Sequence, residues 1–95
     1  MVEPPDVFIT RPTAHAIVKG TVIIQATGSD DVTKMEMYID GFALAGSPRT
    51  SVPWELPWET TRWKNGGHKI VARAIDAAGN VGRAEIIVDV LNVDD

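Results

Sequence analysis

Cysteine is absent from the 95-residue chain, and leucine occurs only three times. Without cysteine, the protein can have neither a disulfide framework nor a thiolate metal site. The longest unbroken apolar run, 42–45, is far shorter than the roughly 20 residues of a membrane-spanning helix. The chain has no block of basic residues and a net charge of −4. We therefore expect neither nucleic-acid binding nor membrane insertion.

β-Branched residues are abundant where leucine is scarce. Valine, isoleucine and threonine contribute 11, 9 and 8 residues, or 28 of the 95. These residue types favour strands over helices. A chain of this length forms one domain with one core. The composition therefore predicts a small, mostly β domain.

Alternation of apolar and polar residues places the strands. In the run 82–90, Ala84, Ile86 and Val88 share one face, and charged residues occupy the other. A helix would scatter these charges around its circumference, whereas a strand separates them onto the solvent side. Runs of this kind predict seven strands, at 7–10, 21–27, 34–39, 42–45, 54–58, 68–76 and 82–90.

Turn residues separate these runs. Asp40-Gly41 predicts a hairpin turn, because a type I′ turn needs positive φ at both central residues. Pro57 removes a ladder donor, so its strand should lie at a sheet edge. Seven short strands with regular turns predict an all-β sandwich of two antiparallel sheets, in the order A, B, C, C′, E, F, G.

Motifs along the chain also carry a family resemblance. They lie at 7–12, 20–26, 28–30, 35–41, 53–60, 65–68 and 76–80. The most distinctive are Met35-Glu36-Met37-Tyr38-Ile39-Asp40-Gly41 and Asp76-Ala77-Ala78-Gly79-Asn80. Together they resemble the bacterial immunoglobulin-like domains of secreted and cell-surface proteins. The resemblance implies an immunoglobulin-like or fibronectin type III-like β-sandwich, an extracellular location and a non-catalytic role as a spacer or interaction module.

The ends of the chain set the expected domain boundaries. Proline and acidic residues near the N-terminus, and a polar C-terminus, suggest linkers at 1–6 and 92–95 around a sandwich at 7–91. Both ends are interpreted as cuts through a longer protein, so neighbouring domains of the same chain are the expected partners. The predicted core contains Val7, Ile9, Val18, Val22, Ile24, Ala26, Val32, Met35, Met37, Ile39, Leu44, Leu56, Trp58, Ile70, Ala72, Ala74, Ile86, Val88 and Val90.

Catalysis is not expected. The two histidines, His15 and His68, have no hydroxyl and acid predicted beside them, and Ser47 and Ser51 lie in a loop. A sandwich this small also has little room for a closed pocket. We therefore interpret the chain as a non-enzyme that needs no cofactor.

Calcium is one candidate ligand. The B–C and F–G loops should meet at one end of the sandwich. They bring Asp30 and Asp31 towards Asp76 and Asn80, which offer the hard oxygen ligands that calcium prefers. The alternative is that these side chains bond to their own turns. A calcium site would make the chain a calcium-stabilised adhesin repeat.

Three tryptophans within ten residues suggest sugar binding as a second possibility. Trp58 occupies the core position of the family resemblance. Trp54 and Trp63 favour the core as well, because aromatic residues dominate small cores. If either is exposed, it offers a flat ring for stacking on a polysaccharide. The chain would then be a carbohydrate-binding accessory module of a polysaccharide-degrading enzyme.

A protein interface is the third candidate site. Tyr38, Val71 and Ile75 fall on the outward register of neighbouring strands, where an apolar patch would mark a contact surface. The alternative is that the aliphatic stems of Lys69 and Arg73 cover them. Strands A and G are expected to place the two ends of the domain at opposite ends of the sandwich, which suits a spacer.

Overall fold

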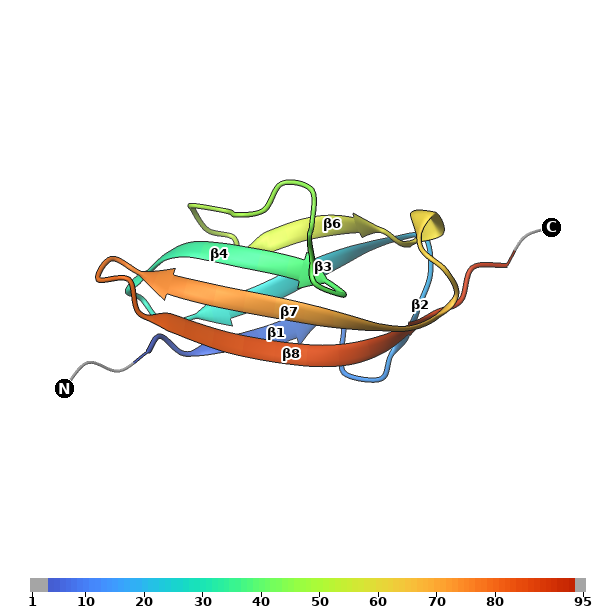
Figure 1. Ribbon diagram of the computed structural model, residues 1–95, viewed down its shortest axis with the longest axis horizontal. Coiled ribbons are helices and arrows are strands. Elements are labelled where there is room, and N and C mark those ends of the chain that lie inside the picture. The colour runs from blue at the N-terminus through green and yellow to red at the C-terminus, as the bar shows by residue number, and fades with distance from the viewer. Residues whose placement is uncertain (1–3, 94–95) are drawn as a thin grey trace.

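Eight strands and one 3-10 turn make up the regular structure of residues 4–93, the part of the chain that the computed structural model describes. The strands form two facing sheets (Figure 1). The elements are β1 (Val7–Arg11), β2 (Ile17–Val18), β3 (Thr21–Gly28), β4 (Val32–Ile39), β5 (Phe42–Ala43), β6 (Glu55–Glu59), η1 (Thr60–Arg62), β7 (Gly66–Asp76) and β8 (Val81–Val90).

The two sheets have different sizes. The smaller sheet has the order β1-β3-β6, and the larger has the order β2-β8-β7-β4-β5. All pairs are antiparallel except β2 with β8, which is parallel. The predicted all-β, immunoglobulin-like sandwich is confirmed. The short strand β2 was not predicted, because two residues are too few to show a period.

The turn between β4 and β5 follows the sequence prediction. Asp40 and Gly41 have φ angles of 51° and 88°, so both adopt the left-handed conformation that a type I′ turn requires. Glycine adopts this conformation without steric cost, and aspartate tolerates it better than most residues. The turn brings Phe42 and Ala43 back beside Ile39 and Tyr38.

Pro57 lies in an edge strand, as predicted, because β6 pairs only with β3. Ala26 donates to the Trp54 carbonyl at 2.9 Å, and Thr60 donates to the Gly20 carbonyl at 3.0 Å. Hydrogen bonding alternates along an antiparallel strand, so residue 57 turns its nitrogen away from β3. Proline therefore costs the sheet no hydrogen bond at this position.

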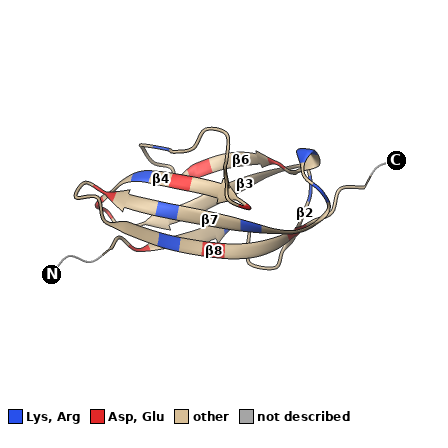
Figure 2. Ribbon diagram, viewed as in Figure 1, with Lys and Arg blue, Asp and Glu red and all other residues tan. Residues whose placement is uncertain are grey.

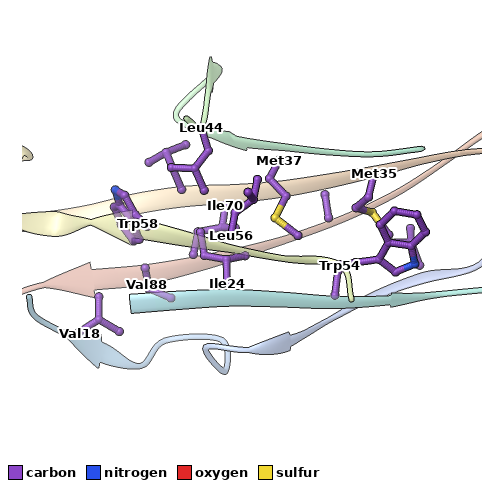
Figure 3. Packing of buried hydrophobic residues seen from close by; sticks show 14 of the residues in the cluster. Val18, Ile24, Met35, Met37, Leu44, Trp54, Leu56, Trp58, Ile70 and Val88 are labelled. Atoms are coloured by element: carbon purple, nitrogen blue, oxygen red, sulfur yellow. The ribbon is translucent and has the colours of Figure 1, made fainter. Parts of the chain in front are cut away.

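The core fills the space between the sheets (Figure 3). Trp58 from β6 is fully buried, as are Met35 and Met37 from β4. Most of the predicted core residues are buried, whereas Ile9, Val22, Val32 and Ile86 are partly buried and pack against the core from its margin. Trp54 also belongs to the core and is 8% exposed.

The sandwich is elongated, with principal extents of 54 × 21 × 19 Å. β1 starts at one end of the long axis and β8 finishes at the other (Figure 1). Within residues 4–93, no helix is long and apolar enough to cross a membrane.

Replacing Trp58 with alanine should lower the free energy of unfolding by about 3–5 kcal/mol, because the surrounding core cannot fill the cavity. Urea denaturation followed by circular dichroism measures this change. Phe8→Ala is the matched control, since Phe8 is 64% exposed and its loss should change stability by less than about 0.5 kcal/mol. Equal midpoints for the two variants would contradict the core assignment.

Candidate functional site

A groove of about 270 Å³ opens where the free edges of the two sheets face each other. We call it the aromatic groove. One wall is the segment Ala43, Leu44 and Ala45, and the other is β6 with the end of η1. It is lined by Ala43, Leu44, Ala45, Pro57, Trp58, Glu59, Arg62 and Trp63.

Four aromatic rings cluster at one end of the groove, and two of them, Trp58 and Trp63, line it. Trp63 makes edge-to-face contacts with Phe42, Trp58 and His68, with ring centroids 6.5, 6.1 and 5.5 Å apart. Such contacts stabilise aromatic pairs beyond simple area burial. Trp58 is fully buried, Trp63 is half-buried and Phe42 is 68% exposed. The exposure of the rings therefore increases from Trp58 in the core, through Trp63, to Phe42 at the surface.

Polar groups accompany these rings. Glu59 and Arg62 are exposed. Hydroxyl hydrogen bonds from Thr61 and Thr21, at 2.9 and 3.0 Å, lower the pKa of Glu59 and keep its carboxylate ionised. The indole Nε1–H of Trp58 is buried and has no hydrogen-bond partner among the described residues. An unpaired buried donor is uncommon in a folded protein.

His68 holds this end of the sandwich together. Its Nδ1 lies 2.5 Å from Asp40 Oδ2, and its Nε2 lies 2.7 Å from the Lys64 carbonyl oxygen. The Lys69 amide donates to the other Asp40 oxygen at 2.8 Å. The imidazole thus joins the β4–β5 turn to the connection that follows η1. We call this pair of contacts the His68 clamp.

The clamp favours a charged histidine. Partial burial of the ring lowers the pKa of His68, but the Lys64 carbonyl and the Asp40 carboxylate together raise that pKa above its ordinary value. Burial raises the pKa of Asp40, but hydrogen bonds from Lys69 and His68, with their positive charges, produce a net lowering. Both acceptors are satisfied at once only when both ring nitrogens carry protons. Below the raised pKa of His68, the clamp is therefore an imidazolium–carboxylate pair in which both ring nitrogens are engaged.

The two tryptophans proposed for glycan binding lie at different places. Trp54 precedes β6 and is 8% exposed, so it offers no face for stacking. Trp63 is half-buried and lines the aromatic groove. Trp54 lines a separate hollow with Gln25, Thr27 and Pro53, but Trp63 is the more exposed of the two tryptophans.

The four residues considered for calcium lie at the same end of the sandwich (Figure 1): Asp30 and Asp31 in the β3–β4 loop, Asp76 at the end of β7 and Asn80 in the loop that follows. Asp76 accepts hydrogen bonds from the amides of Ala78 and Asn80, at 3.0 and 2.8 Å, and from Asn80 Nδ2 at 3.0 Å. These hydrogen bonds lower the pKa of Asp76, and the largest contribution comes from the Asn80 side chain. Asp30 and Asp31 are exposed.

Across residues 4–93, no three acidic or histidine side chains are grouped in a way that could hold a metal ion. The turn itself already uses Asp76 and Asn80. The calcium site stays a prediction of the sequence, and the geometry adds no support to it.

The three residues considered for an interface lie on the outer face of the larger sheet. Tyr38 and Val71 are direct neighbours across β4 and β7. Ile75 lies further along β7 on the same face, with Arg73 between it and Val71. Arg73 pairs with Glu36 at 2.9 Å between them. Val71 is only 8% exposed. The apolar residues are thus interrupted by an ion pair.

Charged residues of both signs are scattered over the rest of this face (Figure 2), and the exposed apolar residues Ile87 and Val81 lie on it as well. Arg83 pairs with Glu85 at 2.7 Å, and Lys69 approaches the same carboxylate at 3.9 Å. Such exposed pairs contribute little to stability, but they keep the surface polar.

Sequence reasoning did not single out Phe42, Glu59 or Arg62 as site residues. Phe42 was expected only as part of a strand. Its position directly after the Asp40-Gly41 turn was the available signal, because a residue there lies at a sheet edge. Nothing in the sequence indicated that the segment after β6 folds back towards it.

Comparison with known families gives the identity of the fold. The bacterial Ig domain family matches residues 5–72, which is more than half of the chain. The chain belongs to this family. The match ends within β7, so the assignment of β8 to the bacterial Ig domain comes from the structure. No protein of curated function matches the sequence.

Solved structures show the same fold at low identity. The fibronectin(III)-like modules of Clostridium thermocellum CbhA are similar at 21% identity and a TM-score of 0.78, over 94% of this chain and all of that chain. An endo-β-1,4-mannanase from Thermotoga petrophila is similar at 16% identity and a TM-score of 0.79, over 98% of this chain and 21% of the mannanase chain.

A third similar structure is the Bacteroides ovatus mixed-linkage glucan utilization locus SGBP-B, solved in complex with a mixed-linkage heptasaccharide. It is 18% identical with a TM-score of 0.68, over 100% of this chain and 26% of that one. The bacterial Ig domain thus spans only about a fifth to a quarter of two of these similar proteins. At these identities, the likeness shows the fold alone.

The His68 clamp should stabilise the domain most between about pH 4 and about pH 6.5. The raised pKa of His68 means that its contribution is complete below its unfolded pKa and is lost as pH rises through the folded value. The lowered pKa of Asp40 means that its contribution is lost as pH falls through the folded value. The difference in melting temperature between the wild type and Asp40→Asn should therefore shrink from about pH 5.5 to about pH 8.5.

Asparagine suits this test because it tolerates the positive φ of residue 40. Asp30→Asn is the control, since it removes the same charge from an exposed loop residue. A difference for Asp40→Asn that stays constant across this pH range would contradict the charged clamp.

Proposed function

We propose that this bacterial Ig domain is a rigid, non-catalytic spacer in an extracellular multidomain protein, where it fixes the distance and orientation of its neighbours. The observation that carries the proposal is the anchoring of both chain ends at opposite ends of the sandwich (Figure 1). A spacer needs this arrangement, because a domain transmits orientation only if the chain enters and leaves along fixed paths.

The incoming segment is packed into the fold before β1 begins. Pro5 is buried beside Gly82 of β8, so closely that a Cβ on Gly82 would lie 1.9 Å from the Pro5 carbonyl oxygen. Asp6 and Ser29 exchange hydrogen bonds at 3.0 and 3.1 Å. Residues 5 and 6, expected to be linker, are thus held by contacts of their own.

The outgoing segment is held by hydrogen bonds beyond β8. The side chain of Asn92 accepts from the Gly20 amide at 2.9 Å and donates to Thr60 Oγ1 at 3.2 Å. Its backbone N–H and carbonyl bond the side chain of Asn65 at 2.8 and 3.0 Å. We call these four bonds the Asn92 anchor. The anchored part of the domain therefore includes residue 92, one residue past the expected boundary.

The buried Thr60 hydroxyl links the anchor to the core. It donates to the Gly20 carbonyl oxygen at 2.6 Å while it accepts from Asn92. Each partly buried polar group here has a partner, so the network can be rigid without leaving an unsatisfied donor. Bending the chain at residue 92 would break several bonds together.

The extracellular setting is supported by the family and by the similar structures, which include a mannanase and a glucan-binding protein. We infer that the neighbours of this domain in its own chain include a part that acts on or binds polysaccharide. Tyr38, Val71 and Ile75 are candidates for contacts with such a neighbour. The ion pair between Arg73 and Glu36 makes that contact a polar one.

Asn92→Ala should loosen the outgoing chain and lower the free energy of unfolding by about 1–2 kcal/mol, because two side-chain hydrogen bonds are lost. In the wild type, the NMR amide order parameters of Leu91 and Val93 should be about 0.85, and in the variant that of Val93 should fall below about 0.6. A small folded reporter domain fused directly after Val93 should tumble with the wild-type domain and independently of the variant.

Val93→Ala is the matched control, because Val93 is 76% exposed and lies outside the anchor. It should preserve both the order parameters and the joint tumbling. A reporter that tumbles independently when fused to the wild type would refute the rigid spacer.

A further inference from the structure

We propose that Asn65-Gly66 is a site of spontaneous deamidation that the Asn92 anchor holds closed, and that its reaction loosens the outgoing chain. The second half of this proposal rests on the proposed spacer function. Asn65 lies in the connection between η1 and β7, and Gly66 is the first residue of β7 (Figure 1). Both residues are exposed, so the water that the reaction consumes can reach them.

Deamidation joins the side chain of an asparagine to the backbone nitrogen of the next residue. That nitrogen loses its proton to solvent and attacks the side-chain carbonyl carbon, Cγ. The bond from the nitrogen to Cγ forms, the bond from Cγ to Nδ2 breaks, and Nδ2 leaves as ammonia. Water then opens the cyclic imide to aspartate or isoaspartate. The reaction therefore needs no enzyme, oxidant or reductant, only a free asparagine side chain and water.

The residue after the asparagine sets the intrinsic rate. Gly66 has no side chain to obstruct the attack on Asn65. The other two asparagines of the chain, Asn80 and Asn92, each precede a valine, whose branched side chain crowds the attacking nitrogen. Asn65 is therefore the reactive asparagine of this sequence, and the other two are internal controls.

The fold engages the side chain that must move. Asn65 Nδ2 donates to the Asn92 carbonyl oxygen at 3.0 Å, and Asn65 Oδ1 accepts from the Asn92 N–H at 2.8 Å. Both polar ends of the side-chain amide are thus bound to one residue of the outgoing chain. Cγ can swing towards the Gly66 nitrogen only after these two bonds open.

The attacking nitrogen is engaged as well. Gly66 is the partner of Val90 in the β7–β8 ladder. The amides of Asp89 and Leu91 donate in the other direction, to Ala16 and Val18 of the β2 region. Because hydrogen bonding alternates along a strand, the backbone groups of Val90 face Gly66. The start of β7 and the Asn92 anchor therefore have to open together before the reaction can begin.

The product cannot restore the anchor. Aspartate at position 65 keeps an acceptor for the Asn92 N–H but has no donor for the Asn92 carbonyl oxygen, so its carboxylate places acceptor against acceptor. Isoaspartate also lengthens the backbone by one methylene group beside Gly66. Either product removes a hydrogen bond that holds residue 92, so the reaction turns a fixed exit of the chain into a looser one.

The first test measures the rate of deamidation in the intact domain at neutral pH, folded and in urea. Trypsin releases residues 65–69 between Lys64 and Lys69, and Asn65 is the only amide side chain of that peptide. Mass spectrometry of the peptide therefore follows Asn65 alone. The folded domain should react at least about tenfold more slowly than the unfolded chain, because only its open fraction reacts.

Asn92→Ala should speed the reaction of the folded domain at least about fivefold, because it removes two hydrogen bonds that keep the anchor closed. Val93→Ala should leave the rate unchanged. Ile24→Val is the control for stability, since it weakens the core to a similar degree at a fully buried residue of β3. It should speed the reaction much less than Asn92→Ala does.

Two results would overturn the guarded site. In urea, reaction of Asn65 no faster than that of Asn80 and Asn92 would show that the site is not reactive. Equal acceleration by Ile24→Val and Asn92→Ala would assign the reaction to global unfolding rather than to opening of the anchor.

Asn65→Asp tests the effect on the outgoing chain, because it supplies the aspartate product directly. The amide order parameter of Val93 should fall below about 0.6, as in Asn92→Ala. Thr50→Asp is the control, since it adds the same charge at an exposed loop residue and should leave that order parameter unchanged. An unchanged order parameter in Asn65→Asp would overturn the loosening. A low value in the wild type would contradict the spacer function instead, and it would leave the deamidation rates as a separate result.

Discussion

The burial of Trp58 is the constraint on which the rest of the structure depends. It is the largest of the fully buried side chains, and it projects from an edge strand into the space between the sheets. Trp63 and His68 pack on its edge, and His68 in turn joins the β4–β5 turn to the connection after η1. The aromatic groove and the His68 clamp therefore both depend on packing against Trp58.

The two ends of the domain are closed by different kinds of contact. At the incoming end, the absence of a side chain on Gly82 allows the Pro5 backbone to pack against β8. At the outgoing end, Asn92, Asn65 and Thr60 close the structure with polar side chains. Close packing and a satisfied hydrogen-bond network both resist bending, so a spacer function needs no large interface with its neighbours.

Much of the fold follows from local pattern, and most of the candidate site does not. Alternation and turn residues predicted seven strands, the Asp40-Gly41 turn and the edge position of Pro57. The two-residue strand β2 is too short to show any period. Contacts such as Asn92 with Gly20, or Phe42 with Trp63, join residues far apart in sequence, so they follow only from the completed packing.

Pro57 has a consequence for proteins that carry several such domains in a row. Tethered copies meet at high effective concentration, and an open strand edge is a template for pairing between chains. The nitrogen of Pro57 faces the free edge of β6, in the middle of the row where a foreign strand would seek a donor. One residue thus leaves the domain's own hydrogen-bond ladder intact while it discourages strand pairing between neighbouring domains.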